Sequence, residues 1–140
     1  MKSQTTRIVG EFNGWDDHML FHLYDGTFWV QARYAYWYHY AYQPEVVLTE
    51  EDGVYYLGLP DSDQRVEVRR TNAVETHIDG AFNGWQGKSV YRLGNGQTWQ
   101  QAHYEYHYVY AFNPEAVLYE ADGEWYLMVA DTVMAVRRVA

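Results

Sequence analysis

The chain repeats itself at a spacing of 70 residues, and this duplication constrains the fold more than any other feature. Between residues 10–57 and 80–127, 24 of 48 positions are identical without a gap. The repeat opens with Gly-Glu-Phe-Asn-Gly-Trp at residues 10–15, which returns as Gly-Ala-Phe-Asn-Gly-Trp at residues 80–85. Two copies are too few for a solenoid, which needs three or more repeats to bury a continuous core. We therefore expect two similar modules packed against each other, over residues 1–72 and 73–140.

The composition excludes several classes of protein. The chain is 48% hydrophobic, which is too apolar for a disordered chain, yet it has no apolar run of the ~20 residues that span a bilayer. The absence of cysteine excludes a disulfide framework, a thiolate metal site and a cysteine nucleophile. A net charge of −9 repels phosphate backbones and anionic lipids, so neither nucleic acid nor a membrane is an expected partner. The polar N-terminus lacks the apolar core of a signal peptide, which predicts a cytoplasmic location.

Both copies are predicted to be β throughout. Asn-Gly and Asp-Gly dipeptides tolerate the positive φ of tight turns, and each copy has three of them as predicted strand reversals. They are Asn13-Gly14, Asp25-Gly26 and Asp52-Gly53, then Asn83-Gly84, Asn95-Gly96 and Asp122-Gly123. No window shows sustained helical periodicity. Five or six short strands in about 65 residues suit a small closed barrel, so the predicted fold is two tandem SH3-like barrels, with an OB-like barrel as the second choice.

One predicted strand, over residues 28–42, changes phase along its length. The residues shared by both copies are odd-numbered at Trp29 and Gln31 but even-numbered from Tyr34 to Tyr42. Because side chains alternate between the two faces of a strand, both sets cannot face the same way in one straight strand. We therefore expect a β-bulge or sharp bend near Ala32-Arg33, and likewise near Ala102-His103.

A row of aromatic residues occupies one face of this strand in each copy. We call the first tyrosine ladder Tyr34, Tyr36, Tyr38, Tyr40 and Tyr42, and the second tyrosine ladder Tyr104, Tyr106, Tyr108, Tyr110 and Phe112. Each ladder can serve as packing surface between modules or subunits, or as a platform that stacks on sugars or bases. The eight tyrosines at 34–40 and 104–110, together with Trp37, are the candidate interface residues.

Other combinations of polar residues give weaker indications of chemistry. His103, Glu105 and His107 share one strand face, and imidazole with carboxylate suits zinc, but solvated polar residues explain the same pattern. The clusters Asp16-Asp17 and Glu50-Glu51-Asp52 lack the opposed geometry of acid–base catalysis. Ser3, Ser62 and Ser89 stand in no recognisable activation setting. We therefore expect no catalytic residue, metal or cofactor. The recurring tryptophans, Trp15, Trp29, Trp85 and Trp99, are predicted core residues.

The order of motifs resembles a small β domain that recurs in uncharacterised bacterial proteins. The second copy carries it as Gly-x-Phe-x-Gly-Trp at 80–85, Asn-Gly-Gln-x-Trp-x-Gln at 95–101, Tyr-x-Tyr-x-Tyr-x-Tyr at 104–110, Pro114 and Tyr-Leu-Met-Val at 126–129. The first copy matches more loosely. This resemblance implies a bacterial source and a small barrel, and it carries no established activity. Separately, Gly-x-Phe-Asn-Gly-Trp is similar to the opening of starch- and glycogen-binding modules, which stack tryptophans on glucose.

These observations predict a non-enzymatic binding protein of two repeated β modules that contacts a protein partner or a second copy of itself. The alternative is a carbohydrate-binding module that stacks sugars on Trp15, Trp85 and exposed tyrosines, so a glycan or another small molecule is a possible ligand.

Overall fold

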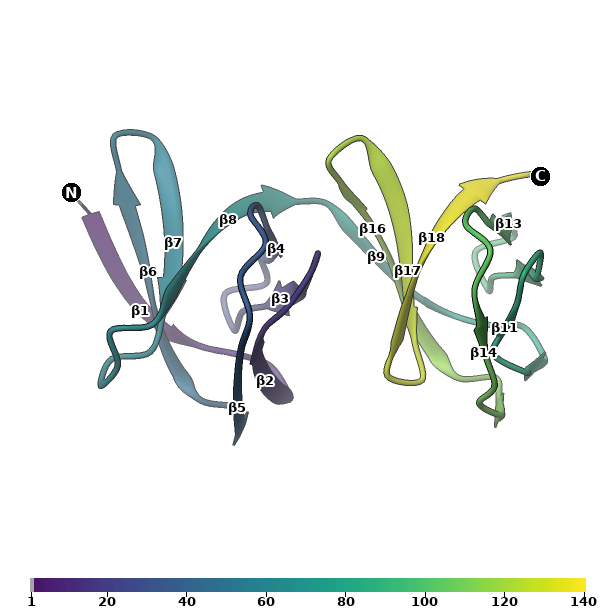
Figure 1. The fold of residues 1–140 in the computed structure, drawn as a ribbon, viewed down its shortest axis with the longest axis horizontal. Helices are drawn as coiled ribbons and strands as arrows, with labels where there is room; N and C mark the ends of the chain where they lie inside the picture. Colours follow the sequence, from purple (N-terminus) through teal and green to yellow (C-terminus); the bar gives the residue numbers. More distant parts are fainter. Residues whose placement is uncertain (1) are drawn as a thin grey trace. The chain divides into compact units, whose positions relative to one another are not determined.

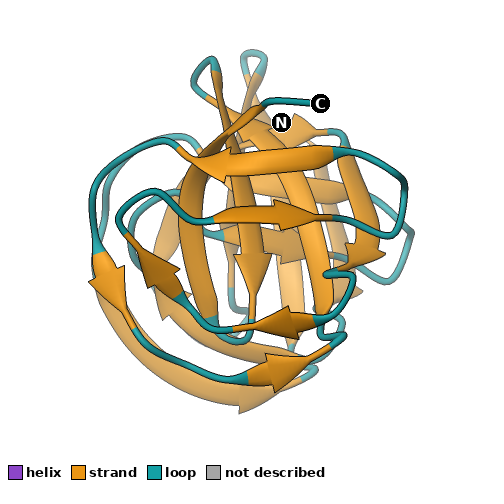
Figure 2. Ribbon diagram, turned by 90° about the vertical axis from the view of Figure 1, so that its right-hand side faces the viewer, coloured by secondary structure: helices purple, strands orange, loops and turns teal. Residues whose placement is uncertain are grey.

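The computed structural model describes residues 2–140, and every regular element in that range is a β-strand, as the sequence predicts (Figure 2). The chain divides into two compact units, the first ending at Thr71 and the second comprising Asn72–Ala140. The first unit contains β1 (Lys2–Arg7), β2 (Glu11–Trp15), β3 (Leu20–His22), β4 (Phe28–Gln31), β5 (Trp37–Tyr42), β6 (Glu45–Glu51), β7 (Val54–Gly58) and β8 (Arg65–Thr71). The second contains β9 (Ala73–His77), β10 (Ala81–Phe82), β11 (Trp85–Gln86), β12 (Val90–Arg92), β13 (Thr98–Gln101), β14 (Tyr106–His107), β15 (Ala111–Phe112), β16 (Glu115–Ala121), β17 (Glu124–Val129) and β18 (Thr132–Arg138).

Each unit is built on one antiparallel sheet of six strands (Figure 1). The order in the first unit is β1-β6-β7-β8-β4-β3, and in the second, read from the corresponding edge, it is β9-β16-β17-β18-β13-β12. Strands at corresponding places come from corresponding parts of the two copies. Beside the sheet, β5 pairs with β2, and in the second unit β15 pairs with β10 and β14 with β11.

The two outer strands of each sheet touch at one end. Just beyond β1 and β3, Ile8 forms an isolated antiparallel bridge with Leu23, and Ile78 forms the same bridge with Leu93. Backbone hydrogen bonds flank the first bridge, since Val9 N–H donates to the His22 oxygen at 2.8 Å and Tyr24 N–H to the Arg7 oxygen at 2.9 Å. The sheets formed by residues 2–140 nevertheless remain open, because the bridge does not extend into a paired strand.

Each unit has its own hydrophobic core on the concave side of its sheet. The four recurring tryptophans are at most 5% exposed, so the prediction that they are core residues is confirmed. Their packing is repeated: Phe12 and Trp15 meet edge to face with ring centroids 5.4 Å apart, and Phe82 and Trp85 do so at the same distance. Truncating a buried aromatic residue costs about 3–5 kcal/mol, so these rings are major determinants of stability.

The predicted turn dipeptides divide into two kinds. Asp52-Gly53 and Asp122-Gly123 connect β6 to β7 and β16 to β17 with positive φ at both residues, as a tight hairpin requires. Asn13-Gly14, in contrast, lies inside β2, so the prediction of a strand reversal there is wrong. The pairing of β2 with β5 shifts its register between Phe12 and Gly14. A Cβ at Gly14 would overlap the carbonyl oxygen of Trp37, so this glycine permits a close approach of two backbones.

The predicted strand over residues 28–42 is two strands. β4 ends at Gln31, β5 begins at Trp37, and the five residues between them belong to no strand. The sequence predicts a β-bulge or sharp bend near Ala32-Arg33, and the strand is interrupted there over five residues.

Candidate functional site

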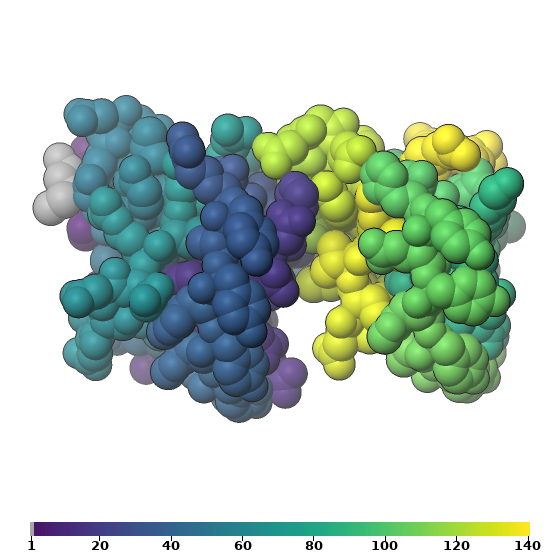
Figure 3. Space-filling model, in the orientation of Figure 1, coloured from purple at the N-terminus to yellow at the C-terminus, as the bar shows by residue number. Residues whose placement is uncertain are grey.

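Both tyrosine ladders lie on the surface of their units. Their ten rings are between 52% and 74% exposed, far more than the core aromatic residues. In Figure 3 the blue segment around residue 40 and the green segment around residue 105 show these side chains as a continuous ridge on each unit. Large apolar groups exposed in a contiguous row mark interaction surfaces, whereas scattered ones carry no such meaning.

Strand alternation explains why the rings of the first ladder point outward. The intervening residues Ala35, Trp37 and Ala41 are partly buried and pack against the first core. β2 supports this packing, since Phe12 lies opposite Ala41 and Trp15 opposite Trp37. Tyr38, Tyr40 and Tyr42 therefore occupy the other face of β5, away from the core, and Tyr34 and Tyr36 are exposed in the segment before it.

A buried glutamine fixes the bend that precedes each ladder. Gln31 and Gln101 are both 2% exposed and are the buried polar side chains of the two cores. Gln101 Nε2 donates to the carbonyl oxygens of His103 at 3.0 Å and Glu105 at 2.9 Å, and its Oε1 accepts from Gly87 N–H at 3.0 Å and Ser89 N–H at 3.3 Å.

The first unit repeats this arrangement with different loop residues. Gln31 Nε2 donates to the carbonyl oxygens of Asp16, Arg33 and Ala35, and its Oε1 accepts from Asp16 N–H at 3.1 Å. The amide thus satisfies backbone groups that the break in the strand would otherwise leave without partners. Sequence reasoning recorded Gln31 and Gln101 as shared residues but assigned them no role. Their recurrence at the same place in both copies was the signal.

The first ladder is large enough to hold a macromolecule. With roughly 200 Å² of accessible surface for one tyrosine ring, its five rings expose on the order of 600 Å². That area reaches the upper end of the ~300–600 Å² found for the largest apolar patch of a typical monomer. It also approaches the ~800 Å² that each partner contributes to a standard protein–protein interface.

The ladders present neutral rings with polar tips. Tyr40 Oη donates to Glu11 Oε1 at 3.3 Å. Desolvation and the neighbouring Glu11 carboxylate both raise the pKa of Tyr40 above its ordinary value of 10.0, so this phenol stays protonated at neutral pH. In the second unit the Tyr104 ring lies so close to Gly87 that a Cβ there would overlap it. Glycine therefore lets this ring lie against the backbone.

Trp37 lies on the reverse side of the first ladder. Its ring stacks on His39 with centroids 5.0 Å apart and approaches Trp15 at 5.5 Å. The structure therefore separates Trp37 from the eight tyrosines with which the sequence groups it. The reason is the alternation of β5, which sends odd-numbered side chains toward the core.

The histidine and carboxylate groups considered from the sequence are not gathered into a metal site within residues 2–140. No three histidine or carboxylate side chains in that range, His103, Glu105 and His107 included, are arranged to hold a metal ion. His103 instead pairs with Glu124 at 3.4 Å. Ser62 and Ser89 each accept a hydrogen bond from a nearby backbone N–H, and Ser3 contacts the Thr49 hydroxyl. Glu51 accepts from Arg65, and this hydrogen bond lowers the pKa of the carboxyl group.

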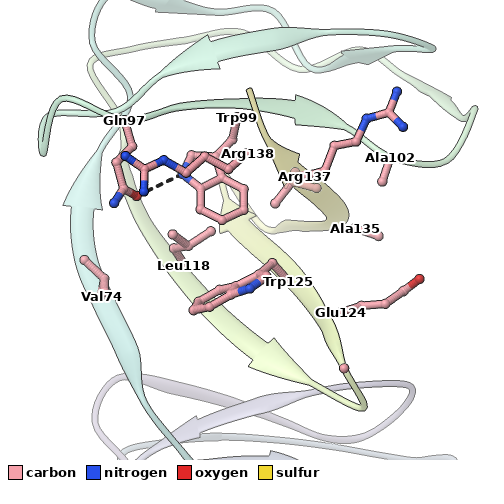
Figure 4. Close-up of a pocket in the computed structure, with 12 residues that line it drawn as sticks. Val74, Gln97, Trp99, Ala102, Leu118, Glu124, Trp125, Ala135, Arg137 and Arg138 are labelled. Carbon is pink, nitrogen blue, oxygen red and sulfur yellow. Dashed lines mark hydrogen bonds between the residues drawn. The ribbon is translucent and has the colours of Figure 1, made fainter. Parts of the chain in front are cut away.

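The second unit also contains a cavity of about 550 Å³ that sequence reasoning missed (Figure 4). The indole rings of Trp99 and Trp125 project into it, Leu118 lies beside them and Arg138 stands at its rim, whereas the Arg137 side chain points away from both indoles. No ladder residue lines it. From the sequence, Trp99 is predicted as a core residue and Trp125 is assigned no role in a site, whereas in the structure Trp125 is only partly buried beside Trp99.

No protein family, curated protein or solved structure matches this chain. No helix formed by residues 2–140 has the length and apolar character needed to cross a membrane. The class that fold and surface define is an all-β protein of two units, each with an outward row of aromatic side chains.

Proposed function

We propose that this chain is a non-enzymatic binding protein made of two tandem SH3-like barrels, and that its tyrosine ladders hold a protein partner. The common strand order of the two sheets supports the tandem arrangement. The bridges Ile8–Leu23 and Ile78–Leu93 support the barrels, because they join the first and third strands at the place where a six-stranded barrel closes.

The exposure of the ladders is the observation that carries this proposal. One face of β5 packs against the core through Trp37 and Ala41, while its tyrosines are exposed on the other face. The folding of the unit therefore does not require the tyrosine face. Tyrosine combines a large apolar ring with a polar tip and loses little conformational freedom on binding, which is why it is enriched at interfaces.

The charge of the chain favours a basic partner. The first 70 residues carry six basic and eleven acidic side chains, a net charge of −5, and the last 70 carry four and eight, a net charge of −4. The negative field of the chain attracts a lysine- or arginine-rich segment. Cation–π contacts with the exposed rings add about 0.5–1 kcal/mol of binding free energy each. A second copy of the chain or a nucleic acid would meet like charge instead.

A glycan is the second candidate ligand, and the open rows of rings favour it, since sugar rings stack on aromatic faces. Trp15 and Trp85 do not take part, because they are 2% and 1% exposed. In this candidate function the sugar therefore stacks on the exposed ladder tyrosines and not on the tryptophans of the Gly-x-Phe-Asn-Gly-Trp motif.

The test compares three kinds of probe on the full chain. An arginine-rich peptide, a peptide in which glutamate replaces each arginine, and a maltooligosaccharide are titrated by isothermal calorimetry. We expect the arginine-rich peptide to bind and the other two to show no heat of binding. Binding of the maltooligosaccharide alone would favour the glycan candidate, and silence of all three would contradict the proposal.

Two variants locate the binding surface. The triple substitution Tyr36→Ser, Tyr38→Ser and Tyr106→Ser removes three ladder rings, and Tyr24→Ser is the control because Tyr24 is 53% exposed but lies outside both ladders. We expect at least a tenfold loss of affinity in the triple variant and none in the control, with melting temperatures close to that of the parent. Equal affinity in all three proteins would refute a role of the ladders. Light scattering that shows a dimer of the parent and a monomer of the triple variant would identify self-association instead.

A further inference from the structure

The cavity of the second unit combines an aromatic wall with a basic rim. Trp99 on β13 and Trp125 on β17 lie with ring centroids 5.6 Å apart and planes tilted by 51°. Val136 lies opposite Trp125 in the sheet and Leu118 forms the apolar floor. We propose that this cavity is a binding site for a small anionic aromatic molecule, a flat ring that carries a carboxylate.

The size of the cavity suits such a ligand. Small-molecule sites have volumes of about 300–1,000 Å³, are lined mainly by apolar and aromatic groups and contain a few polar groups that orient the ligand. The cavity has about 550 Å³ and matches this description. Its aromatic wall selects a flat ring over a bulky aliphatic group, because aromatic pairs gain about 0.5–1.5 kcal/mol beyond the area they bury.

Two donors that line the cavity, the Trp125 indole N–H and the Arg138 guanidinium, can bind the ligand's carboxylate. A third donor, Trp99 Nε1–H, is already bonded to Gln97 Oε1 at 3.0 Å, and this bond fixes the Trp99 ring. Trp125 lines the cavity, and its Nε1–H has no hydrogen-bond partner anywhere in residues 2–140. Arg138 lies opposite Trp99 across the strand pair, and its Nε donates to the Ala140 oxygen at 3.1 Å, so the side chain is held along the rim. The Arg138 guanidinium lies on the Trp99 side of the cavity and the Trp125 N–H on another side (Figure 4), and either group can bind an anionic oxygen.

The cavity is basic in an acidic chain. Its charged lining residues are Arg137, Arg138 and Glu124, and of the two arginines Arg138 lies beside the indoles while the Arg137 guanidinium points away from them (Figure 4). Glu124 already accepts from Tyr126 Oη at 3.1 Å and lies 3.4 Å from His103 Nε2. Glu124 thus has partners of its own, and the charge of Arg138 at the rim favours an anion, although the chain as a whole carries −9.

The first unit supplies a natural contrast. There Arg70 lies opposite Trp29 as Arg138 does opposite Trp99, but Asp25 stands where the second unit has Asn95. Burial raises the pKa of Asp25, yet hydrogen bonds from Thr27 and Gln4 and the charge of Arg70 together lower it below 3.8. Asp25 is therefore a carboxylate that already uses the positive field of Arg70. In the second unit Asn95 is uncharged and donates to Gln97, which lines the cavity, so no carboxylate at this position competes with a ligand for Arg138.

The test titrates the ¹⁵N-labelled full chain with 2-naphthoate and follows the indole N–H signals by NMR, with Trp125 assigned from a Trp125→Phe sample. We expect the Trp125 signal to shift and saturate and the Trp99 signal to move less, because its proton is already bonded. 2-Naphthamide, which has the same ring without the charge, should bind at least tenfold more weakly. A Trp125 signal that stays unmoved at millimolar 2-naphthoate, or equal binding of the amide, would overturn the proposal.

Matched variants attribute the effect to the rim. Arg138→Gln removes the charge, and Asn95→Asp introduces the carboxylate found in the first unit, so each should weaken 2-naphthoate at least tenfold. Arg70→Gln changes the corresponding arginine of the first unit and should leave the affinity within twofold. If Arg70→Gln weakens binding as much as Arg138→Gln, the site is not this cavity. The triple ladder variant should bind 2-naphthoate normally, which separates this proposal from the function of the ladders.

Discussion

Replacing Gln101 by leucine removes the amide that fixes the bend before the second tyrosine ladder. The side chain is almost fully buried and makes four hydrogen bonds, all to backbone groups of the segments 87–89 and 103–105. Leucine has a similar length but can neither donate nor accept. Two N–H groups and two carbonyl oxygens therefore lose their partners at once.

The expected cost follows from these four bonds. Each contributes about 0.5–1.5 kcal/mol net, and a buried group left without a partner costs about 1–3 kcal/mol. The buried leucine returns about 1.5–3 kcal/mol of hydrophobic stabilisation. With about 1 kcal/mol net for each of the four bonds and about 2 kcal/mol returned by leucine, the destabilisation is at least about 2 kcal/mol, which for a unit of this size lowers the midpoint of thermal unfolding by about 8–16 °C.

Calorimetric and urea unfolding of the full chain measure this cost. Gln100→Leu is the control, because its side chain points to the opposite side of β13 and the same chemical change there should alter the free energy of unfolding by less than about 0.5 kcal/mol. Gln31→Leu should reproduce the effect in the first unit. If Gln101→Leu is no more destabilising than Gln100→Leu, the buried amide does not determine the bend.

Two further substitutions test the local structure. Gly84→Ala should lower the free energy of unfolding in urea by about 3 kcal/mol or more, because the new Cβ would overlap the His107 carbonyl oxygen. Gly80 also has a positive φ but open space around it, so Gly80→Ala should cost only about 1 kcal/mol. Equal costs for the two variants would contradict the close approach at Gly84. Asp25→Asn should remove part of the acid sensitivity of stability. With a lowered pKa in the folded state, Asp25 stabilises fully above its ordinary pKa and loses this contribution as the pH falls through the lowered value, while asparagine keeps the turn, as Asn95 does with Gln97 N–H at 3.0 Å. An unchanged pH profile of unfolding between about pH 6 and pH 2.5 would contradict this assignment.

The all-β fold and the buried tryptophans could be predicted from the sequence because they depend on local and repeated signals. Asp52-Gly53 and Asp122-Gly123 lie between runs of alternating apolar residues, and that combination indicates a hairpin without further context. Comparison of the two copies also identified the tyrosine face as the one that both share. Repetition within one chain thus replaced the comparison with relatives that would normally supply this information.

Other features could not be predicted, because they depend on segments that meet only in the folded chain. Asn13-Gly14 has the composition of a turn, but its glycine is needed for the approach of β5, 23 residues away at Trp37. In the sequence Gln101 looks like any polar residue of a strand, and its burial depends on the contact with the loop at 87–89 in the folded chain. The cavity depends on Trp125 remaining partly exposed beside Trp99, a matter of packing that no local pattern encodes.

The buried glutamines and the exposed tyrosines belong to one design. Trp29 and Gln31 of β4 face the core, and so do Trp37 and Ala41 of β5, all of them at odd-numbered positions. The bend after Gln31 therefore changes the direction of the chain while the even-numbered tyrosines stay on the side that faces solvent. Burying an amide that needs four partners is a costly way to break a strand, and a plain glycine turn would cost less. The arrangement is understandable if the orientation of the ladders matters, because the amide fixes the direction of β5 as well as its starting point. It follows that a variant with a flexible loop in place of the glutamine-bonded bend should keep its tyrosines exposed and yet lose affinity for the partner.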